Sequence, residues 1–166
     1  LRRELSQDPQ IAMRFFNEAR AASRVEHSGI VEIFEFGHLP DETAYIIMEF
    51  LRGEPLSARL RAMGGKLPLP DIIRISRQIA SALAATHAKG IVHSDFKPGN
   101  VFVTRFGVIK IIDFGIARAA KKKLIGDSDG DKTTFDAANL GALTPAYASP
   151  EMFQGLEPDP RDDIFA

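Results

Sequence analysis

Residues 93–100 read His-Ser-Asp-Phe-Lys-Pro-Gly-Asn, and residues 113–115 read Asp-Phe-Gly. These stretches adjoin two short apolar runs, residues 91–93 and 108–112, that each predict a β-strand. Charged groups without partners are costly where strands end in a protein core, so these polar side chains are expected to meet at one site. Carboxylate and amide oxygens suit Mg²⁺, and a nearby lysine can neutralise a phosphoryl group. The pattern therefore indicates a site for a metal ion and a phosphate.

The residues nearest the start of the chain predict a helix. Asp8 and Pro9 are typical of a helix N-terminus. The apolar residues that follow at helical spacing are Ile11, Phe15, Ala19 and Ala22. Glu18 falls at the margin of this stripe, where a carboxylate either reaches water or meets a cation inside the protein.

Two β-rich runs follow, at residues 30–36 and 44–50, and a turn at residues 39–42 separates them. They predict an antiparallel hairpin. Residues 57–63 predict a short helix inside a stretch rich in glycine and proline. Residues 101–104 predict a further strand, joined to the run at residues 108–112 by a turn.

Residues 71–89 predict a second, longer helix. Its apolar face is expected to consist of Ile72, Ile75, Ile79, Leu83 and Thr86. The polar residues expected away from that face are Arg74, Arg77, Gln78 and Lys89. The periodicity fails from about residue 117 to residue 140, which predicts a surface loop.

The composition sets limits on the function. The chain has 166 residues, a net charge of −1 and no cysteine, so neither disulfides nor a Cys-ligated zinc site can form. No broad basic surface argues for nucleic acid. No apolar run approaches the roughly 20 residues that span a bilayer.

The motif His93-x-Asp95-x-Lys97-x-x-Asn100, followed by Asp113-Phe-Gly, resembles the signature of eukaryotic-like (bacterial Hanks-type) serine/threonine protein kinases. Three further segments resemble the family in the right order. Glu18 matches the glutamate of the αC helix, residues 48–51 match the gatekeeper and hinge, and residues 141–151 match the end of the activation segment.

The resemblance implies an α+β fold, the two-lobed protein-kinase fold truncated at both ends. Residues 1–50 would form a partial N-lobe with the αC helix and the two strands at residues 30–36 and 44–50. Residues 51–166 would form the hinge and a partial C-lobe with the catalytic loop and the activation segment. Because the sequence starts at Leu1 and stops in an apolar run, we expect a fragment of a longer protein.

The implied reaction is transfer of the γ-phosphoryl group of Mg·ATP to serine or threonine hydroxyls of proteins. Asp95 would orient the substrate hydroxyl or accept its proton, and Lys97 would stabilise the γ-phosphate. Asn100 and Asp113 would hold Mg²⁺. Lys97, with Thr144 before a proline, resembles the serine/threonine branch of the family, and Thr144 would contact the catalytic loop.

The resemblance also implies a nucleotide site. Leu51 would present backbone groups to adenine, Glu49 would supply a backbone carbonyl, and Phe102 would lie under the adenine ring beside the gatekeeper Met48. The expected nucleotide-binding residues are Glu18, Met48, Glu49, Leu51, Lys97, Asn100, Phe102 and Asp113. The implied internal packing residues are His93, Phe114, Ala22 and Ile33. Asp163 would cap backbone amides of the catalytic loop.

Several departures from the family pattern have consequences. The sequence holds no Gly-rich loop and no lysine on a strand before Glu18, so we expect the fragment alone to be inactive and poorly stable. Ser94 stands where the family has an arginine that pairs with a phosphorylated activation loop, and a hydroxyl cannot form that pair. We therefore expect activity to depend little on phosphorylation of Thr133 and Thr134.

Two alternatives stay open. The parent protein could be a pseudokinase that binds nucleotide without transfer, although it retains Asp95, Lys97, Asn100 and Asp113. It could also be a small-molecule kinase, although such enzymes usually lack the pattern at residues 144–151. The expected partners are protein substrates bearing Ser or Thr, with no nucleic acid and no membrane segment in this stretch. A cytoplasmic domain in bacterial signalling is expected, and a membrane anchor elsewhere in the parent is left open.

Overall fold

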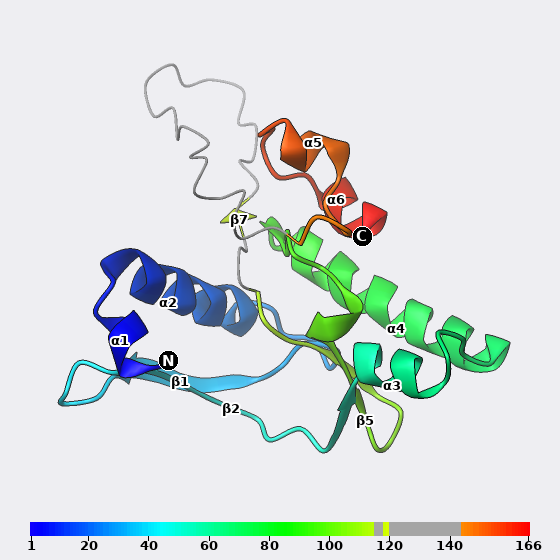
Figure 1. Ribbon diagram of the computed structural model, residues 1–166, viewed down its shortest axis with the longest axis horizontal. Helices are drawn as coiled ribbons and strands as arrows, with labels where there is room; N and C mark the ends of the chain where they lie inside the picture. Colours follow the sequence, from blue (N-terminus) through cyan, green and yellow to red (C-terminus); the bar gives the residue numbers. More distant parts are fainter. Residues whose placement is uncertain (115–117, 120–143) are drawn as a thin grey trace.

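The computed structural model describes residues 1–114, 118–119 and 144–166. The elements, in chain order, are α1 (Arg3–Ser6), α2 (Pro9–Ser23), β1 (Ile33–His38), β2 (Ala44–Met48), β3 (Gly53–Pro55), α3 (Leu56–Ala62), α4 (Leu69–Ala88), β4 (Ile91–Val92), the 3₁₀ turn η1 (Pro98–Asn100), β5 (Val101–Thr104), β6 (Ile109–Ile111), β7 (Arg118–Ala119), α5 (Pro150–Phe153) and α6 (Pro160–Phe165). Figure 1 shows α2 over the β1–β2 hairpin on one side, and α3 and α4 on the other with β5 beside them. Helices α5 and α6 lie above α4 in this view.

Helix α2 begins where the sequence predicts. The Asp8 side chain accepts hydrogen bonds from the backbone N–H groups of Gln10 and Ile11, at 2.8 and 3.3 Å. The buried residues of α2 are Ala12, Phe16, Ala19, Ala21 and Ala22. The short helix α1, which no sequence signal indicated, precedes it.

The inward face of α2 differs in part from the predicted stripe. Ala19 and Ala22 are buried as expected, whereas Ile11 and Phe15 are only half-buried. Phe16 takes the inward position, because its ring packs on the hairpin with its centroid 4.8 Å from that of His38. The helix is therefore turned slightly about its axis relative to the prediction.

The predicted hairpin is confirmed. Strands β1 and β2 are antiparallel, with Phe36 opposite Ile46, and the register shifts near Ile33. β1 starts three residues later than predicted because the preceding segment pairs elsewhere. Ile30 forms a parallel bridge with Ile111, and so this segment joins the hairpin to β6.

Strands β3, β5 and β6 form an antiparallel sheet in that order. Strand β3 falls in a stretch that the sequence predicts to be irregular, and it pairs with β5. Gly53 allows this approach, since a Cβ atom there would lie 2.1 Å from the Val103 carbonyl oxygen. The turn expected between β5 and β6 is confirmed, and Gly107 adopts φ +75° within it.

Helix α4 is confirmed, but it starts two residues earlier than predicted. The buried residues of α4 are Ile75, Ala82, Leu83 and Thr86. Ile72 was expected on this face and is instead 42% exposed. Gln78 was expected to point away, yet its amide donates to the Gly107 carbonyl and accepts from the Ile109 N–H, both at 3.1 Å. It turns inward because it satisfies two backbone groups at the turn end of the β5–β6 hairpin.

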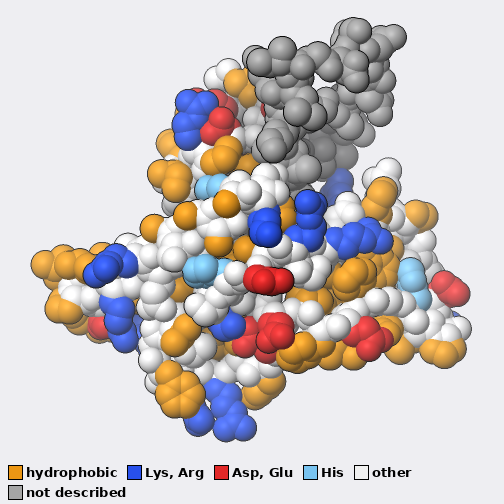
Figure 2. Space-filling view, turned by 180° about the vertical axis from the view of Figure 1, so that it is seen from behind, with side chains coloured by type: hydrophobic (Ala, Val, Ile, Leu, Met, Phe, Trp, Pro, Cys, Tyr) orange, Lys and Arg blue, Asp and Glu red, His pale blue; other side chains and the backbone are white. Residues whose placement is uncertain are grey.

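The hydrophobic core lies between α4, the end of α2 and the inner face of the β3–β5–β6 sheet. Val101, Val103, Ile109 and Ile111 supply that sheet face, and each is at most 1% exposed. Phe114 closes the core beside them. Figure 2 shows hydrophobic side chains that also reach the surface over much of one face. Among the described residues, no helix is both long and apolar enough to span a membrane.

Candidate active site

The loop between β4 and η1 is held in an unusual backbone conformation. Ser94 has φ +64°, and Asp113, which follows β6, has φ +62°. Non-glycine residues seldom adopt positive φ, and such strain persists only where surrounding contacts hold it. The two strained residues belong to the two stretches that the sequence singled out.

Three side chains meet at the end of this loop. The Lys97 Nζ lies 2.5 Å from the Asp95 Oδ2 and donates to the Thr144 Oγ1 at 2.7 Å. The Thr144 hydroxyl in turn donates to the Asp95 Oδ1 at 2.7 Å. Each carboxylate oxygen of Asp95 therefore has one donor, and its orientation is fixed. The predicted contact of Thr144 with this loop is confirmed.

Asn100 connects this cluster to the strand before Asp113. Its side-chain nitrogen donates to the backbone carbonyl of Asp95 at 3.0 Å. Its backbone carbonyl accepts from the Ile112 N–H at 2.9 Å. Since the amide nitrogen is used, the Asn100 Oδ1 is left as an acceptor. In the described part of the chain, no hydrogen bond or ion pair engages that oxygen or the exposed Asp113 carboxylate. Two side-chain oxygens at neighbouring strand ends are thus available to bind a ligand.

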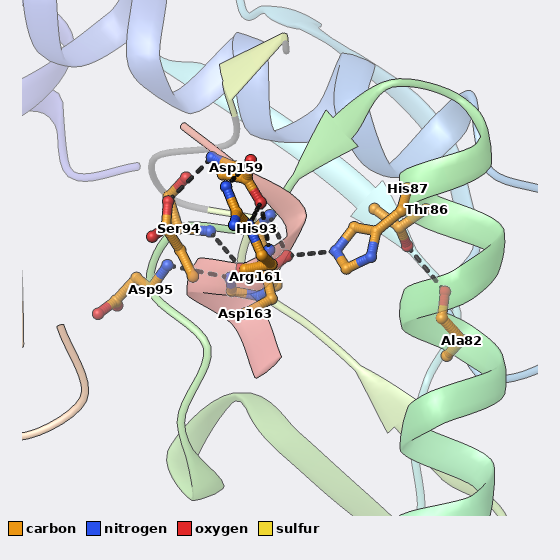
Figure 3. Close-up of polar contacts among 10 residues, drawn as sticks. Ala82, Thr86, His87, His93, Ser94, Asp95, Asp159, Arg161 and Asp163 are labelled. Carbon is orange, nitrogen blue, oxygen red and sulfur yellow. Dashed lines mark hydrogen bonds and ion pairs between the residues drawn. The ribbon is translucent and has the colours of Figure 1, made fainter. Parts of the chain in front are cut away.

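Asp163, at the start of α6, fixes the other end of the loop. Its carboxylate accepts from the backbone N–H groups of His93 and Ser94, both at 2.9 Å, as predicted. The same carboxylate lies 2.7 Å from the His87 Nε2 of α4. Figure 3 shows these three partners around Asp163, which is only 3% exposed. The α6 carboxylate therefore ties the loop to α4, and sequence reasoning missed the part played by His87.

The His93 ring packs inside the protein, as the resemblance implied. Its centroid lies 4.8 Å from that of Phe114 and 5.7 Å from that of Phe96. Burial lowers the pKa of His93, and the nearby carboxylate of Asp163 opposes that effect only in part. The neighbouring Ser94 hydroxyl is buried and has no hydrogen-bond partner among the described residues.

A cleft of about 470 Å³ opens between α2, the hairpin and the β5–β6 sheet. The predicted site residues that line it are Glu18, Met48, Glu49, Leu51, Phe102 and Asp113. Asp95, Lys97 and Asn100 do not line it and form the separate cluster described above. The contact between Asn100 and Ile112 joins the two groups, because Ile112 also lines the cleft.

Glu18 carries the largest electrostatic perturbation in the cleft. Burial raises the pKa of its carboxyl to about 7, and the negative charge of Asp113 adds to the effect. No cation among the described residues pairs with Glu18. The sequence placed this carboxylate at the margin of the helix, and the structure adds that it faces an acidic neighbour.

The Glu49 side chain has partners that sequence reasoning missed. Its carboxylate forms an ion pair with Lys110 of β6 and accepts from the Glu32 N–H at 2.9 Å. The only signal in the sequence is a lysine between two core isoleucines, which predicts that its side chain lies on the outer face of the strand.

The comparison with known families agrees with this geometry. A family model described as "Protein kinase domain" matches residues 2–166. The chain belongs to the protein kinase family. This confirms the resemblance and the α+β kinase fold predicted above. Members of this family generally use ATP and Mg²⁺.

Named relatives of this kinase chain are bacterial serine/threonine kinases. The chain is 35% identical to the serine/threonine-protein kinase PknA of Mycobacterium tuberculosis, over all of this chain and 37% of that protein. It is 39% identical to a probable serine/threonine-protein kinase of Streptomyces coelicolor, over all of this chain and 24% of that protein. A third relative, Pkn1 of Myxococcus xanthus, is 38% identical over all of this chain and 23% of its own length. The chain therefore spans well under half the length of each relative.

Proposed function

We propose that the protein transfers the γ-phosphoryl group of ATP, with Mg²⁺, to serine or threonine hydroxyls of other proteins. The observation that supports this function is the hydrogen-bonded cluster of Asp95, Lys97 and Thr144, which Asn100 links to the cleft. It supplies a fixed carboxylate and a cation beside a cavity large enough for a nucleotide. Phosphoryl transfer depends mainly on such positioning and on charge stabilisation.

The acceptor hydroxyl would approach Asp95. A carboxylate held by two donors can orient that hydroxyl and take up its proton as the new O–P bond forms and the bond between the γ-phosphorus and the oxygen of the leaving ADP breaks. Lys97 would balance the negative charge on the transferred phosphoryl group. Thr144 would keep both side chains in place, since its hydroxyl contacts both.

The purine would lie in the cleft between Met48 and Phe102. Neither the Glu49 carbonyl nor the Leu51 N–H takes part in a backbone hydrogen bond within the described residues. An acceptor and a donor two residues apart suit the edge of adenine. The apolar lining supplied by Ile33, Met48 and Phe102 suits its faces.

Asn100 and Asp113 are the residues that would hold Mg²⁺. Both offer side-chain oxygens that receive no hydrogen bond from the described residues, and hard oxygen ligands suit this ion. When bound, the ion would neutralise charge on the phosphates. Asp113 would hold it from the cleft side, and Asn100 from the side of the Asp95 cluster.

The serine/threonine preference rests on Lys97 and Thr144 and on the names of the three relatives. The proposed use of ATP would place this chemistry in the cytoplasm of a bacterium. We also propose the division of the chain that the resemblance implies. It has a partial N-lobe at residues 1–50 and a hinge with a partial C-lobe at residues 51–166.

The test is phosphoryl transfer from γ-labelled ATP by the full-length protein, with Mg²⁺ and a basic protein substrate. An Asp95→Asn variant keeps the shape of the side chain and removes its basicity. We expect label on serine or threonine, and roughly 10²–10⁴-fold slower transfer by the variant. Equal rates for both proteins would contradict the role of Asp95. Nucleotide binding without any transfer would instead favour the pseudokinase alternative.

A further inference from the structure

Lys110 lies on the cleft side of the β5–β6 sheet. It pairs directly with Phe102 across the two strands, so the two side chains share one face. Their neighbours Val101, Val103, Ile109 and Ile111 face the core on the other side. Phe102 lines the cleft, and the Lys110 side chain on the same face of the sheet reaches Glu49, which also lines the cleft.

The ammonium group of Lys110 joins two segments. It forms an ion pair with the Glu49 carboxylate and donates to the Ile30 carbonyl at 3.3 Å. The Glu49 carboxylate also accepts from the Glu32 N–H at 2.9 Å, and the Glu49 N–H donates to the Glu32 carbonyl at 3.0 Å. Residue 49 is therefore bound both to β6 and to the segment that precedes β1.

This contact is shielded from water. The Lys110 side chain is 16% exposed and that of Glu49 is 24% exposed. Ion pairs at the surface contribute little, because water screens them and the side chains stay mobile. When one partner of a shielded pair is removed, a charge is left uncompensated, and the remaining group moves toward water. Loss of Lys110 would thus leave the Glu49 carboxylate uncompensated and loosen the attachment of residue 49 to β6, while its hydrogen bonds with Glu32 remain.

We propose that Lys110 is a positioning residue for the nucleotide base, acting through Glu49. It would fix the position of the Glu49 carbonyl and the Leu51 N–H relative to Phe102. The edge of the purine could then meet these two backbone groups while its face lies on Phe102. Lys110 also neutralises the Glu49 carboxylate, whose unpaired negative charge beside the cleft would repel phosphates. This role rests on the proposed use of ATP.

The positioning role makes a prediction that a purely structural role does not. Lys110→Met in the full-length protein should weaken binding of a fluorescent ATP analogue, measured with Mg²⁺, by roughly three- to tenfold. Turnover at saturating ATP and the KM for the protein substrate should change less than about twofold. Lys110→Arg keeps the charge and should restore affinity. Lys66→Met removes an exposed lysine outside the cleft and serves as the matched control.

Coupling between the two residues tests the mechanism. In a Glu49→Gln background, Lys110→Met should cause little further loss of ATP affinity, because both changes break the same contact. Fully additive losses would overturn the action through Glu49. Unchanged affinity in Lys110→Met, with the wild type binding normally, would overturn the positioning role alone. A wild-type protein that does not bind the analogue would overturn the proposed function and this role together.

Discussion

At the scale of single residues, the site is built from side chains whose ionisation and orientation depend on their neighbours. Asp95 is oriented by Lys97 and Thr144, each within 2.7 Å. Glu18 has no such partner among the described residues, and burial, with the negative charge of Asp113 adding to it, raises its pKa to about 7. The sequence predicted that carboxylates at positions 95 and 18 belong to the site. It did not predict that their electrostatic surroundings differ.

The raised pKa of Glu18 predicts that this carboxylate destabilises the folded chain as pH rises. Its folded-state pKa of about 7 lies above the ordinary value of 4.5, so the folded state holds the proton more tightly. The contribution to stability is complete below pH 4.5 and is lost as the pH rises through 7. The shift sets an upper limit of roughly 3 kcal/mol, which partial solvation should reduce to about 1–2 kcal/mol.

Glu18→Gln in the 166-residue chain should therefore raise the free energy of unfolding at pH 8 and leave it nearly unchanged at pH 4. Urea unfolding at the two pH values is the measurement, and Glu26→Gln, at an exposed position, is the control. A stability gain of equal size at both pH values would show that the effect does not come from ionisation.

At the scale of elements, α6 fixes a loop that lies 69 and 70 residues before it in the chain. The Asp163 carboxylate joins α6 to the loop that follows β4, because it accepts hydrogen bonds from two backbone N–H groups of that loop. It also contacts His87 of α4. Hydrogen bonds to a buried carboxylate are stronger than those between neutral groups. The conformation of the loop after β4 thus depends on its contact with α6, which His87 of α4 supports through Asp163, and not on the loop sequence alone.

Asp163→Asn should lower the free energy of unfolding by about 2–4 kcal/mol. The amide retains one oxygen but turns an N–H donor toward a second donor, and it removes the charge. Chemical unfolding followed by circular dichroism is the measurement. Asp159→Asn makes the same change at the N-cap of α6, where asparagine caps equally well, and should have a much smaller effect. Equal midpoints for Asp163→Asn and wild type would refute this assignment.

At the scale of the whole molecule, the described fold leaves large apolar side chains in contact with water. Phe50 is 85% exposed, Phe106 is 76% exposed and Ile164 is 69% exposed. Exposed apolar surface of this kind is typical of faces that another part of a protein or a partner covers. The core between α4 and the sheet is nevertheless closed, so the chain should fold while remaining prone to self-association.

The 166-residue chain alone is expected to unfold cooperatively and to bind the hydrophobic dye ANS in its folded state. Replacing both Ile164 and Phe165 by serine should reduce dye fluorescence without lowering the unfolding midpoint, because both are exposed. Light scattering over a range of concentrations would report self-association. A monomer that binds no dye would contradict the expected exposure.

The sequence by itself determined the family, the main helices and strands, and the residues of the motif, although it gave no sign of α1 or β3. The hairpin, α2, α4 and the β5–β6 turn follow from periodicity and from turn residues, which act locally. The contacts of Asp163 and Thr144 with the catalytic loop were predictable through the resemblance. Residues 115–117 and 120–143, which include Thr133, Thr134 and most of the expected surface loop, lie outside the described residues, so those predictions stay untested.

Only the tertiary structure decided how distant segments meet. The inward turn of Gln78, the exposure of Ile72 and the pairing of β3 with β5 all depend on neighbours far away in the chain. The same holds for the ion pair of Lys110 with Glu49, 61 residues apart. A periodic pattern specifies which face of an element is apolar, but unsatisfied backbone groups and charges on other elements select the partner of each polar side chain.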